Sequence, residues 1–313
     1  MELVRGIHNL TPAHRGCVLT IGNFDGVHRG HAAVIQRLVT VARQFDVPAT
    51  VMLFEPQPQE FFMGARAPAR LNLLRDKLAR LAALGVDRVL CVRFDQAFAG
   101  QQPDHFVEQL LVAQLGIRYL VVGDDFCFGK DRRGDFALLQ SAGERFGFAV
   151  QDTASLRLSD ERISSTGIRN ALAAGDLALV ESMLGHPYCI SGRVAHGDKL
   201  GRTLDFPTAN ILLKRQVVPV QGVYAVTVRT EDGRQHGGVA NVGRRPTLGG
   251  TQSRLEVHIF DFDADLYGQH LQVELVSWLR EEQAFASLEA LKAQIQADAN
   301  QARNRLADAN LFV

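Results

Sequence analysis

Short apolar runs alternate with amphipathic stretches along the first half of the chain. Four runs have the length and composition of buried strands, at residues 17–21, 49–54, 88–94 and 117–122. Apolar residues at helical spacing predict helices between or after these runs, over residues 33–45, 71–84 and 103–115. Strands that alternate with helices in this way predict a doubly wound, parallel α/β sheet.

The pattern changes after a predicted helix at residues 177–184. Gly185, His186 and Pro187 would end that helix, so we expect a domain boundary near residue 186, between domains 1–186 and 187–313. Short alternating runs follow, at residues 188–194, 222–229, 237–242, 255–260 and 271–279. Such strands, joined by turns, predict an antiparallel β-barrel.

Two further elements complete the predicted barrel. Residues 231–234 (EDGR) have the composition of a hairpin turn between two of the strands. Residues 287–306 form an amphipathic helix that would close the barrel, with one apolar face made of Leu288, Leu291, Ile295 and Leu306.

Composition narrows the class of protein. The 313 residues include 34 basic and 34 acidic side chains, and this zero net charge argues against a broad surface for nucleic acid or anionic membrane. The four cysteines are scattered, which suits reduced, mostly buried thiols rather than a disulfide frame or a zinc site. We find neither a signal-peptide pattern at the N-terminus nor an apolar run long enough to span a membrane, so we expect a cytoplasmic protein.

The segment GNFDGVHRGH, at residues 22–31, carries the first candidate chemistry. It joins the first predicted strand to the first predicted helix, a position where ligands bind in parallel α/β sheets. His28 and His31 are three residues apart and share one face of the first helical turn, where free N–H groups favour an anion. Two imidazoles there suit a phosphate that gains charge during reaction. A His-x-x-His pair is also compatible with a metal site or an ordinary helix start.

A second polar loop follows the fourth predicted strand, at residues 123–134. It is not a P-loop, because its glycine spacing is one residue too long and Asp131 occupies the Ser/Thr position. Asp125 and Lys130 could hold a polar ligand, and a solvated turn is the alternative.

The segment ISSTGIR, at residues 163–169, precedes another predicted helix. Its hydroxyl side chains could simply cap that helix. The same hydroxyls, together with free N–H groups and Arg169, could also form a phosphate clamp.

Three features in the second half could carry chemistry. Residues 192–202 form a glycine-spaced loop that could cover a nucleotide or be a surface hairpin. In an extended strand Thr208 and Asn210 point the same way, and a hydroxyl with an amide oxygen suits Mg²⁺. Glu256 alternates with apolar neighbours, so it faces either solvent or a cleft where it could act as a general base.

The motifs GNFDGVHRGH, VGDDFCFGK and ISSTGIR, in this order, resemble the adenylyltransferase module of bacterial bifunctional riboflavin kinase/FAD synthetases, a family of HxGH nucleotidylyltransferases. This resemblance implies that His28 and His31 bind the ATP phosphates and stabilise the pentavalent α-phosphorus. It implies further ATP-binding residues at Gly22, Asn23, Phe24, Asp25, Ser164, Ser165, Thr166 and Arg169. Asp125, Phe126 and Phe128 would lie at the flavin, and Asn23, Asp25 and Asp125 would help to position ATP, magnesium or the FMN phosphate.

The motifs FPTAN, NVGRRPT, LEVHIFDF, LYG and LREEQAF resemble the riboflavin kinase module of the same family. The resemblance implies that Thr208 and Asn210 hold magnesium and ATP phosphate, and that Glu256 activates the ribityl 5′-hydroxyl. It places Arg280 beside the flavin and a nucleotide flap at Gly197, Lys199 and Gly201. Asp205 departs from the glycine that the family usually has before FPTAN, which would affect the flap.

The sequence therefore predicts a bifunctional enzyme that converts riboflavin and ATP to FMN, and FMN and ATP to FAD and pyrophosphate, with Mg²⁺ at both steps. Its expected partners are the small molecules riboflavin, FMN and ATP, without nucleic acid or membrane, and the oligomeric state is left open. Two alternatives are an adenylyltransferase for another phosphorylated substrate with a barrel that only binds, and a non-catalytic flavin or nucleotide sensor.

Overall fold

The structure is a computed structural model that describes residues 1–123, 125–153, 156–158, 161–196, 206–213, 217–247 and 250–311. The chain forms two compact units. The first comprises Met1–Pro68 and Asn72–Ser165, and the second comprises Ala69–Leu71 and Thr166–Val313. Each unit has its own sheet and its own apolar core.

A six-stranded sheet in the order β1-β4-β3-β2-β5-β6 forms the centre of the first unit, and every pairing in it is parallel. Its strands are β1 (Glu2–Arg5), β2 (Val18–Ile21), β3 (Ala49–Glu55), β4 (Arg88–Arg93), β5 (Tyr119–Gly123) and β6 (Ala149–Thr153). The doubly wound parallel sheet is confirmed, and the four predicted strands are its four central strands. The strands at the two edges, β1 and β6, were not predicted because partial exposure leaves them without an apolar run.

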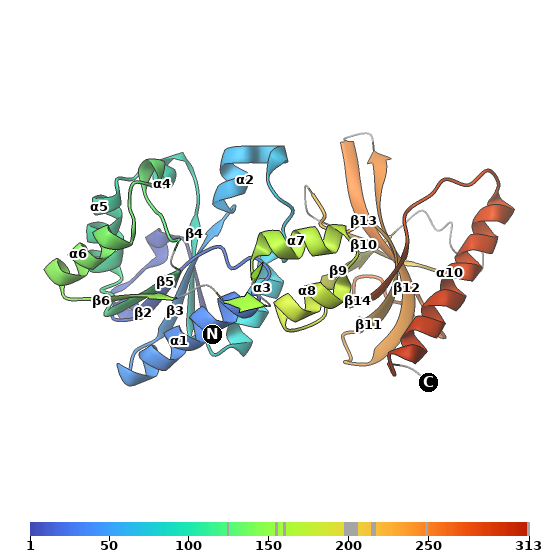
Figure 1. Cartoon of the computed structure of the whole chain (residues 1–313), viewed down its shortest axis with the longest axis horizontal. Coiled ribbons are helices and arrows are strands. Elements are labelled where there is room, and N and C mark those ends of the chain that lie inside the picture. Colours follow the sequence, from blue (N-terminus) through green and yellow to red (C-terminus); the bar gives the residue numbers. More distant parts are fainter. Residues whose placement is uncertain are drawn as a thin grey trace. The chain divides into compact units, whose positions relative to one another are not determined.

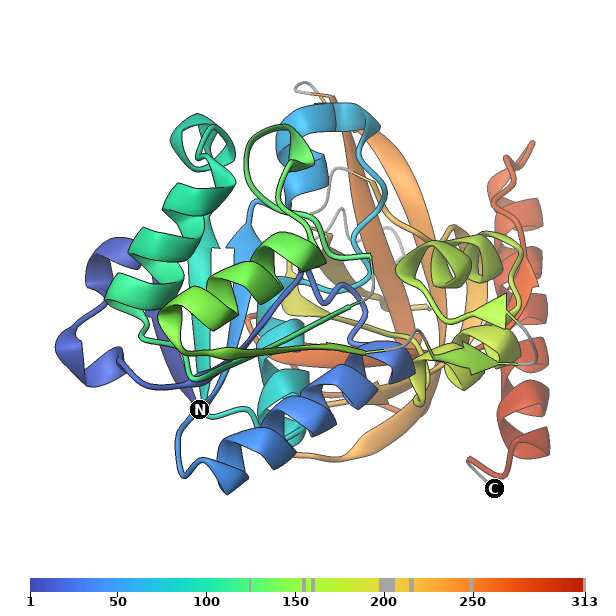
Figure 2. The same ribbon diagram turned by 60° about the vertical axis from the view of Figure 1, so that its left-hand side comes forward.

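Helices cover both faces of this sheet (Figures 1 and 2). Apolar residues of α1 (Arg29–Gln44) and α3 (Leu74–Ala83) pack in the cluster on one face. The cluster on the other face takes apolar residues from η4 (Phe106–Gln114), a π-helical stretch that continues α5 (Pro103–His105), and from α6 (Phe136–Phe146). The three predicted helices are confirmed, whereas α6 was not predicted.

Shorter elements complete the first unit. They are η1 (Ile7–Asn9), η2 (Pro12–His14), α2 (Pro58–Met63), η3 (Gly64–Arg66), α4 (Gln96–Ala99), η5 (Lys130–Arg132), and the two-stranded sheet of β7 (Arg157–Leu158) and β8 (Glu161–Arg162).

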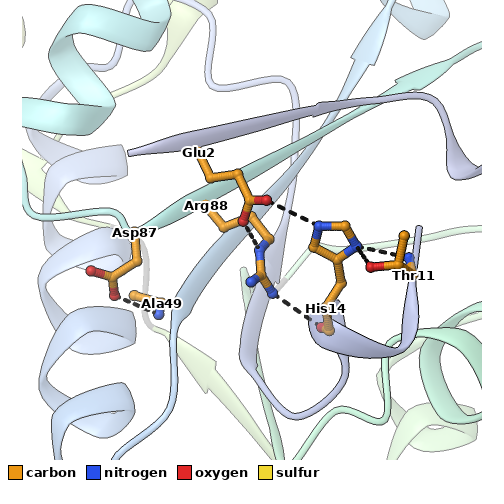
Figure 3. Close-up of polar contacts among 6 residues, drawn as sticks. All are labelled: Glu2, Thr11, His14, Ala49, Asp87 and Arg88. Atoms are coloured by element: carbon orange, nitrogen blue, oxygen red, sulfur yellow. Dashed lines mark hydrogen bonds and ion pairs between the residues drawn. The ribbon is translucent and has the colours of Figure 1, made fainter. Parts of the chain in front are cut away.

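Polar contacts fasten the edge strand β1 at the amino-terminal end of the sheet (Figure 3). Glu2 accepts hydrogen bonds from Arg88 Nε at 2.7 Å and from His14 Nε2 at 3.0 Å. His14 Nδ1 accepts the Thr11 N–H at 2.8 Å, so the proton of this imidazole is on Nε2. Arg88 also donates to the His14 carbonyl. These bonds lie at the end of the sheet away from the loops that follow β2 and β5, which indicates a structural role.

The strand order creates a topological switch point between β2 and β5. The chain leaves β2 towards β3 on one side, while β5 pairs with β2 on the other side. In open α/β sheets ligands bind in the crevice at the carboxyl ends of such strands. The two candidate loops of the first unit follow these two strands, so the fold brings them to one edge.

The second unit contains a closed antiparallel barrel in the order β10-β13-β12-β11-β14-β9. Its strands are β9 (Cys189–Ala195), β10 (Ala209–Leu212), β11 (Gly222–Arg229), β12 (Gln235–Thr247), β13 (Gly250–Ile259) and β14 (His270–Arg280). The barrel is confirmed; the four-residue strand β10 was not among the predicted runs. The 231–234 turn joins β11 to β12, with the Thr230 N–H bonded to the Arg234 carbonyl.

Helices α7 (Ser165–Ala173) and α8 (Leu177–Leu184) precede the barrel, and α10 (Leu288–Asp308) runs along its outside (Figures 1 and 2). Leu291 and Ile295 of α10 pack on the barrel, and Leu306 is buried there. The prediction for Leu288 was wrong: it is 57% exposed, because the apolar cluster under α10 begins one turn later.

The sequence also led to expectations about the cysteines and about membrane-spanning segments. Cys17 and Cys91 are buried, Cys127 and Cys189 are partly exposed, and all four are free thiols. In the part of the chain that the structure describes, we find no helix that is both long and apolar enough to cross a membrane.

Candidate active sites

The turn after β2 has an unusual backbone. Phe24 and Val27 have φ values of 46° and 43°, and Gly26 between them has φ 89°. Left-handed backbone costs a bulky side chain roughly 1–3 kcal/mol and persists only where surrounding contacts enforce it. Such strain is typical of loops that hold a ligand, and it identifies this turn as the candidate site of the first unit.

Asp25 is the centre of the contacts that hold the turn. Its side chain is buried, and its carboxylate accepts the Asn72 N–H at 3.3 Å. Its backbone carbonyl accepts the Ser165 hydroxyl at 2.9 Å. Asn72 and Ser165 are far away in sequence, so the turn is fixed by two separate segments of the first unit. Two of the predicted ATP-binding residues, Asp25 and Ser165, are thus brought into contact.

His28 and His31 lie against each other at the start of α1. Their rings stack with centroids 3.6 Å apart and planes inclined by 17°. His28 occupies the N-cap position, and its Nδ1 accepts the His31 backbone N–H at 3.3 Å. The neutral His28 ring therefore carries its proton on Nε2, which can donate to a phosphate oxygen. The Phe24 ring lies 5.1 Å from the His31 ring and covers one side of the pair.

Both imidazoles are held in the neutral form. The pKa of His28 is lowered from 6.5 to about 4, chiefly by burial; the Asp25 charge opposes this shift, and the Arg162 charge contributes to it. The pKa of His31 is well below its usual value because of burial, the neighbouring His28 and the Lys77 charge. At neutral pH the pair offers hydrogen bonds to a phosphate rather than two positive charges.

The depressed pKa of His28 predicts a pH-dependent stability. Since the folded state binds this proton only near pH 4, the unfolded state binds more protons between pH 6.5 and 4. His28 therefore lowers the free energy of unfolding as pH falls, by about 2 kcal/mol at pH 5 relative to pH 7.5. Urea unfolding followed by far-UV circular dichroism at the two pH values measures this loss. His31 contributes a loss of the same sign because its pKa is lowered as well. His28→Gln should therefore reduce the total loss by about 2 kcal/mol, and an equal loss in wild type and variant would contradict the burial of His28.

Gly30, between the two histidines, leaves room for the His28 ring. A Cβ at this position would lie 3.1 Å from His28 Nδ1 and 3.2 Å from Cε1. Gly30→Ala should displace the ring by a few tenths of an ångström and lower FAD formation about 10-fold. The variant should still fold, because alanine stabilises a helix relative to glycine. Steady-state assays of both reactions check this, and unchanged FAD formation would show that the His28 position is not critical.

The three predicted flavin residues after β5 have different surroundings. Asp125 is exposed and accepts a hydrogen bond from Arg162 Nη2 at 2.9 Å. The Phe126 ring stacks on Phe128 with centroids 5.7 Å apart. Phe128 is buried in the core cluster, 5.4 Å from Phe106. The structure thus presents an exposed ion pair, a partly buried ring and a core ring behind it.

Aromatic contacts continue from this pair along the carboxyl edge of the sheet. Successive ring centroids are 5.1–6.1 Å apart from Phe106 through Phe98, Phe54, Phe94 and Phe61 to Phe62. Phe62 on α2 is 67% exposed. An aromatic surface therefore follows the edge at which the histidine pair lies.

The division between the units falls within the ISSTGIR segment. Ser164 is partly buried in the first unit. In the second unit Thr166 is exposed, and Arg169 Nε donates to the Ala69 carbonyl at 2.5 Å. Arg169 therefore holds the short Ala69–Leu71 segment against its own unit.

A row of polar side chains crosses three strands of the barrel. Glu256 on β13 is the direct antiparallel partner of Asn210 on β10 and of Asn241 on β12. Directly opposed residues have Cβ atoms roughly 4.5–5.5 Å apart on the same face of a sheet. Asn210 is buried and Glu256 is partly buried, while the neighbouring Leu255 and Val257 point to the opposite, apolar side. This row is the candidate site of the second unit.

Thr208 and Asn210 lie together at one end of the row. Asn210 Nδ2 donates to the Thr208 carbonyl at 3.3 Å, so its amide oxygen is the atom that would face a cation. His258 contributes a hydrogen bond to the Pro207 carbonyl at 2.9 Å, which fixes the same segment against β13. Among the described residues, no group of three His, Cys, Asp or Glu side chains could hold a metal ion. A hydroxyl and an amide oxygen fit Mg²⁺ that keeps phosphate and water ligands.

Among the remaining predicted residues of the second unit, Arg280 lies in the same register row, two strands beyond Asn241, and the others lie outside the described residues. Arg280 Nε and Nη2 donate to the two carboxylate oxygens of the buried Asp298 of α10, at 2.9 Å and 2.7 Å. Gly197, Lys199 and Gly201 of the predicted flap, and the unusual Asp205, lie outside the described residues.

Two residues close to these sites escaped the sequence analysis. Lys77 is fully buried and its Nζ donates to the Asn23 carbonyl at 2.6 Å. Its signal was a lysine on the apolar face of a predicted helix. Asn241 faces Glu256, and its Nδ2 donates to Glu282 Oε1 at 3.1 Å. Asn241 Oδ1 is buried, with no hydrogen-bond partner among the described residues. Only the strand register reveals this residue.

Comparison with known proteins gives the same two parts. Residues 10–167 match the family model of FAD synthetase, and residues 184–306 match that of riboflavin kinase. A protein of Escherichia coli (strain K12) named bifunctional riboflavin kinase/FMN adenylyltransferase is 57% identical over 304 residues, which is 97% of each chain. A Haemophilus influenzae protein of the same name is 53% identical over 303 residues, 97% of this chain and 98% of that one.

A solved structure extends the comparison to the fold. It is titled as a macrolide-efflux protein from Streptococcus pneumoniae and superimposes with a TM-score of 0.82 at 28% identity. The match covers 97% of this chain and 99% of that one.

Proposed function

Because this chain belongs to the family of bifunctional riboflavin kinase/FMN adenylyltransferases, we propose a division of labour between its two candidate sites. The chain is a flavin-cofactor enzyme that makes FMN from riboflavin and FAD from FMN. We assign adenylyl transfer to the histidine pair of the first unit and the kinase step to the polar row of the barrel.

Adenylyl transfer needs no protein nucleophile, since the FMN phosphate itself attacks the α-phosphorus of ATP. The oxygen of FMN forms the new P–O bond as pyrophosphate leaves. The protein must align the two phosphates and stabilise the charge that develops. Nε2–H of neutral His28 supplies one hydrogen bond, and His31 stacked behind it sets the position of the ring. The observation that carries this assignment is the neutral, stacked pair at the start of α1, next to the switch point.

Other predicted residues would complete this site. The turn from Gly22 to Asp25 would hold ATP, and the Ser164–Arg169 segment would hold the β,γ-phosphates. Phe126 would stack on the flavin ring, and Phe128 would support Phe126 from the core. The flavin would then lie beside the series of aromatic rings that starts at these two residues. Asp125, paired with Arg162, would lie beside the FMN phosphate.

The kinase step needs a base for the ribityl 5′-hydroxyl of riboflavin. Glu256 would take that proton as the hydroxyl oxygen attacks the γ-phosphorus and ADP leaves. Its cross-strand partner Asn210, with Thr208, would orient the phosphates on the same face of the barrel. Arg280 would lie beside the flavin, with its guanidinium held by Asp298.

Magnesium fits this proposal at Thr208 and Asn210. When bound there with ATP, it supplies neutralisation of phosphate charge. The side chains themselves bind and orient the nucleotide.

We further propose domains 1–186 and 187–313 for the two activities, with Gly197, Lys199 and Gly201 forming the flap over the kinase nucleotide. The partners would be riboflavin, FMN and ATP, without nucleic acid or membrane, and the location would be the cytoplasm.

Labelled ATP tests the two reactions. With riboflavin, label in the γ-phosphate should appear in both FMN and FAD, and label in the α-phosphate should appear in FAD alone. Chromatography of the flavins measures both. FAD without label from the α-position would contradict adenylyl transfer. If no γ-labelled FMN formed from riboflavin, the barrel would only bind its ligand and would not phosphorylate it.

A further inference from the structure

Lys77 is the one fully buried lysine or arginine among the described side chains of the first unit. It lies on α3, between apolar residues that pack against the sheet. Removing an ammonium group from water costs several kcal/mol, so such a residue persists only where its charge has a use.

The ammonium group lies at the adenylyl-transfer site. Its Nζ donates to the Asn23 carbonyl at 2.6 Å, directly before the left-handed residue Phe24. The positive charge of Lys77 also acts on the histidine pair, because this charge contributes to the lowered pKa of His31. Lys77 therefore contacts the strained turn at the Asn23 carbonyl, and the histidine pair follows at the end of the same turn.

We propose that Lys77 is a positioning residue for adenylyl transfer, which holds the turn through Asn23 and places a fixed positive charge near the bound ATP phosphates. A triphosphate brings several negative charges into a site whose two imidazoles are neutral. A buried cation interacts with that charge more strongly than an exposed arginine would, because water screens it less. This inference rests on the assignment of adenylyl transfer to the His28–His31 site.

The test uses the full chain with Lys77→Met, and Arg75→Met on an exposed position of the same helix as its matched control. For Lys77→Met, kcat/KM for ATP in the FMN-to-FAD reaction should fall about 10- to 100-fold, with KM for FMN within about 2-fold of wild type. The kinase reaction should stay close to wild type, and urea unfolding shows which fraction of each variant is folded, so that rates are compared per folded molecule. Arg75→Met should leave both reactions unchanged.

A second variant separates charge from hydrogen bonding. Lys77→Gln keeps a donor for the Asn23 carbonyl but removes the charge, so it should remain several-fold impaired in kcat/KM for ATP. Full recovery in Lys77→Gln would overturn the role of the charge. A lowered urea midpoint in Lys77→Met, with activity per folded molecule unchanged, would overturn the proposal and leave Lys77 as a structural residue. If the His28→Ala/His31→Ala variant still made FAD, the site assignment itself would fail instead.

Discussion

Replacing both His28 and His31 with alanine should stop synthesis at FMN. In the proposed assignment His28 Nε2–H donates to the α-phosphate where charge develops, and His31 holds the His28 ring in place. The turn at residues 22–31 contains no other histidine that could replace them. Removal of one such donor typically lowers kcat about 10²–10³-fold, so the double variant should lose at least that much FAD formation. Riboflavin phosphorylation should be unchanged, because we assign it to the polar row of the barrel. Chromatographic separation of FMN and FAD after incubation with riboflavin and Mg-ATP measures both.

The control for this variant is His105→Ala, which removes an exposed histidine of the same unit. It should leave both activities at the wild-type level. Loss of FMN formation in a folded His28→Ala/His31→Ala protein would show that the two reactions share a site.

Glu256→Gln should have the opposite effect, blocking FMN formation while supplied FMN is still converted to FAD. Glutamine keeps the size of the side chain and its place between Asn210 and Asn241, but it cannot accept the proton of the ribityl hydroxyl. Loss of a general base lowers the rate about 10²–10⁴-fold. The initial rate of FMN formation from riboflavin measures the effect.

Glu289→Gln, an exposed position at the start of α10, is the matched control for Glu256→Gln and should behave as wild type. A Glu256→Gln protein that phosphorylates riboflavin at more than a tenth of the wild-type rate would remove Glu256 from the role of base.

The fold could be predicted where burial shaped the sequence. The four central strands of the parallel sheet are covered on both faces and read as apolar runs, whereas β1 and β6 at the edges are not. The failure at Leu288 has a similar cause. Helical spacing predicts which side of a helix is apolar, but not the turn at which the helix first meets its neighbour.

The candidate sites could be predicted only as far as a motif or an alternation pattern reaches. Spacing in the sequence placed His28 and His31 on one face, whereas alternation alone would usually place Glu256 in solvent. The strand register resolves this ambiguity, because it sets Glu256 beside Asn210 and Asn241. The sequence shows Lys77 only as a lysine on the apolar face of a predicted helix. Its contact with Asn23 joins residues 54 positions apart and is seen only in the structure.

Mixing the two inactive variants tests whether domains 1–186 and 187–313 each carry out one complete reaction. Neither Glu256→Gln nor His28→Ala/His31→Ala should form FAD from riboflavin and Mg-ATP when incubated alone. Mixed in equal amounts they should form it, because FMN made by one protein is the substrate of the other. A mixture that makes no FAD, although one variant still makes FMN and the other still adenylylates supplied FMN, would contradict this division of labour between the two sites.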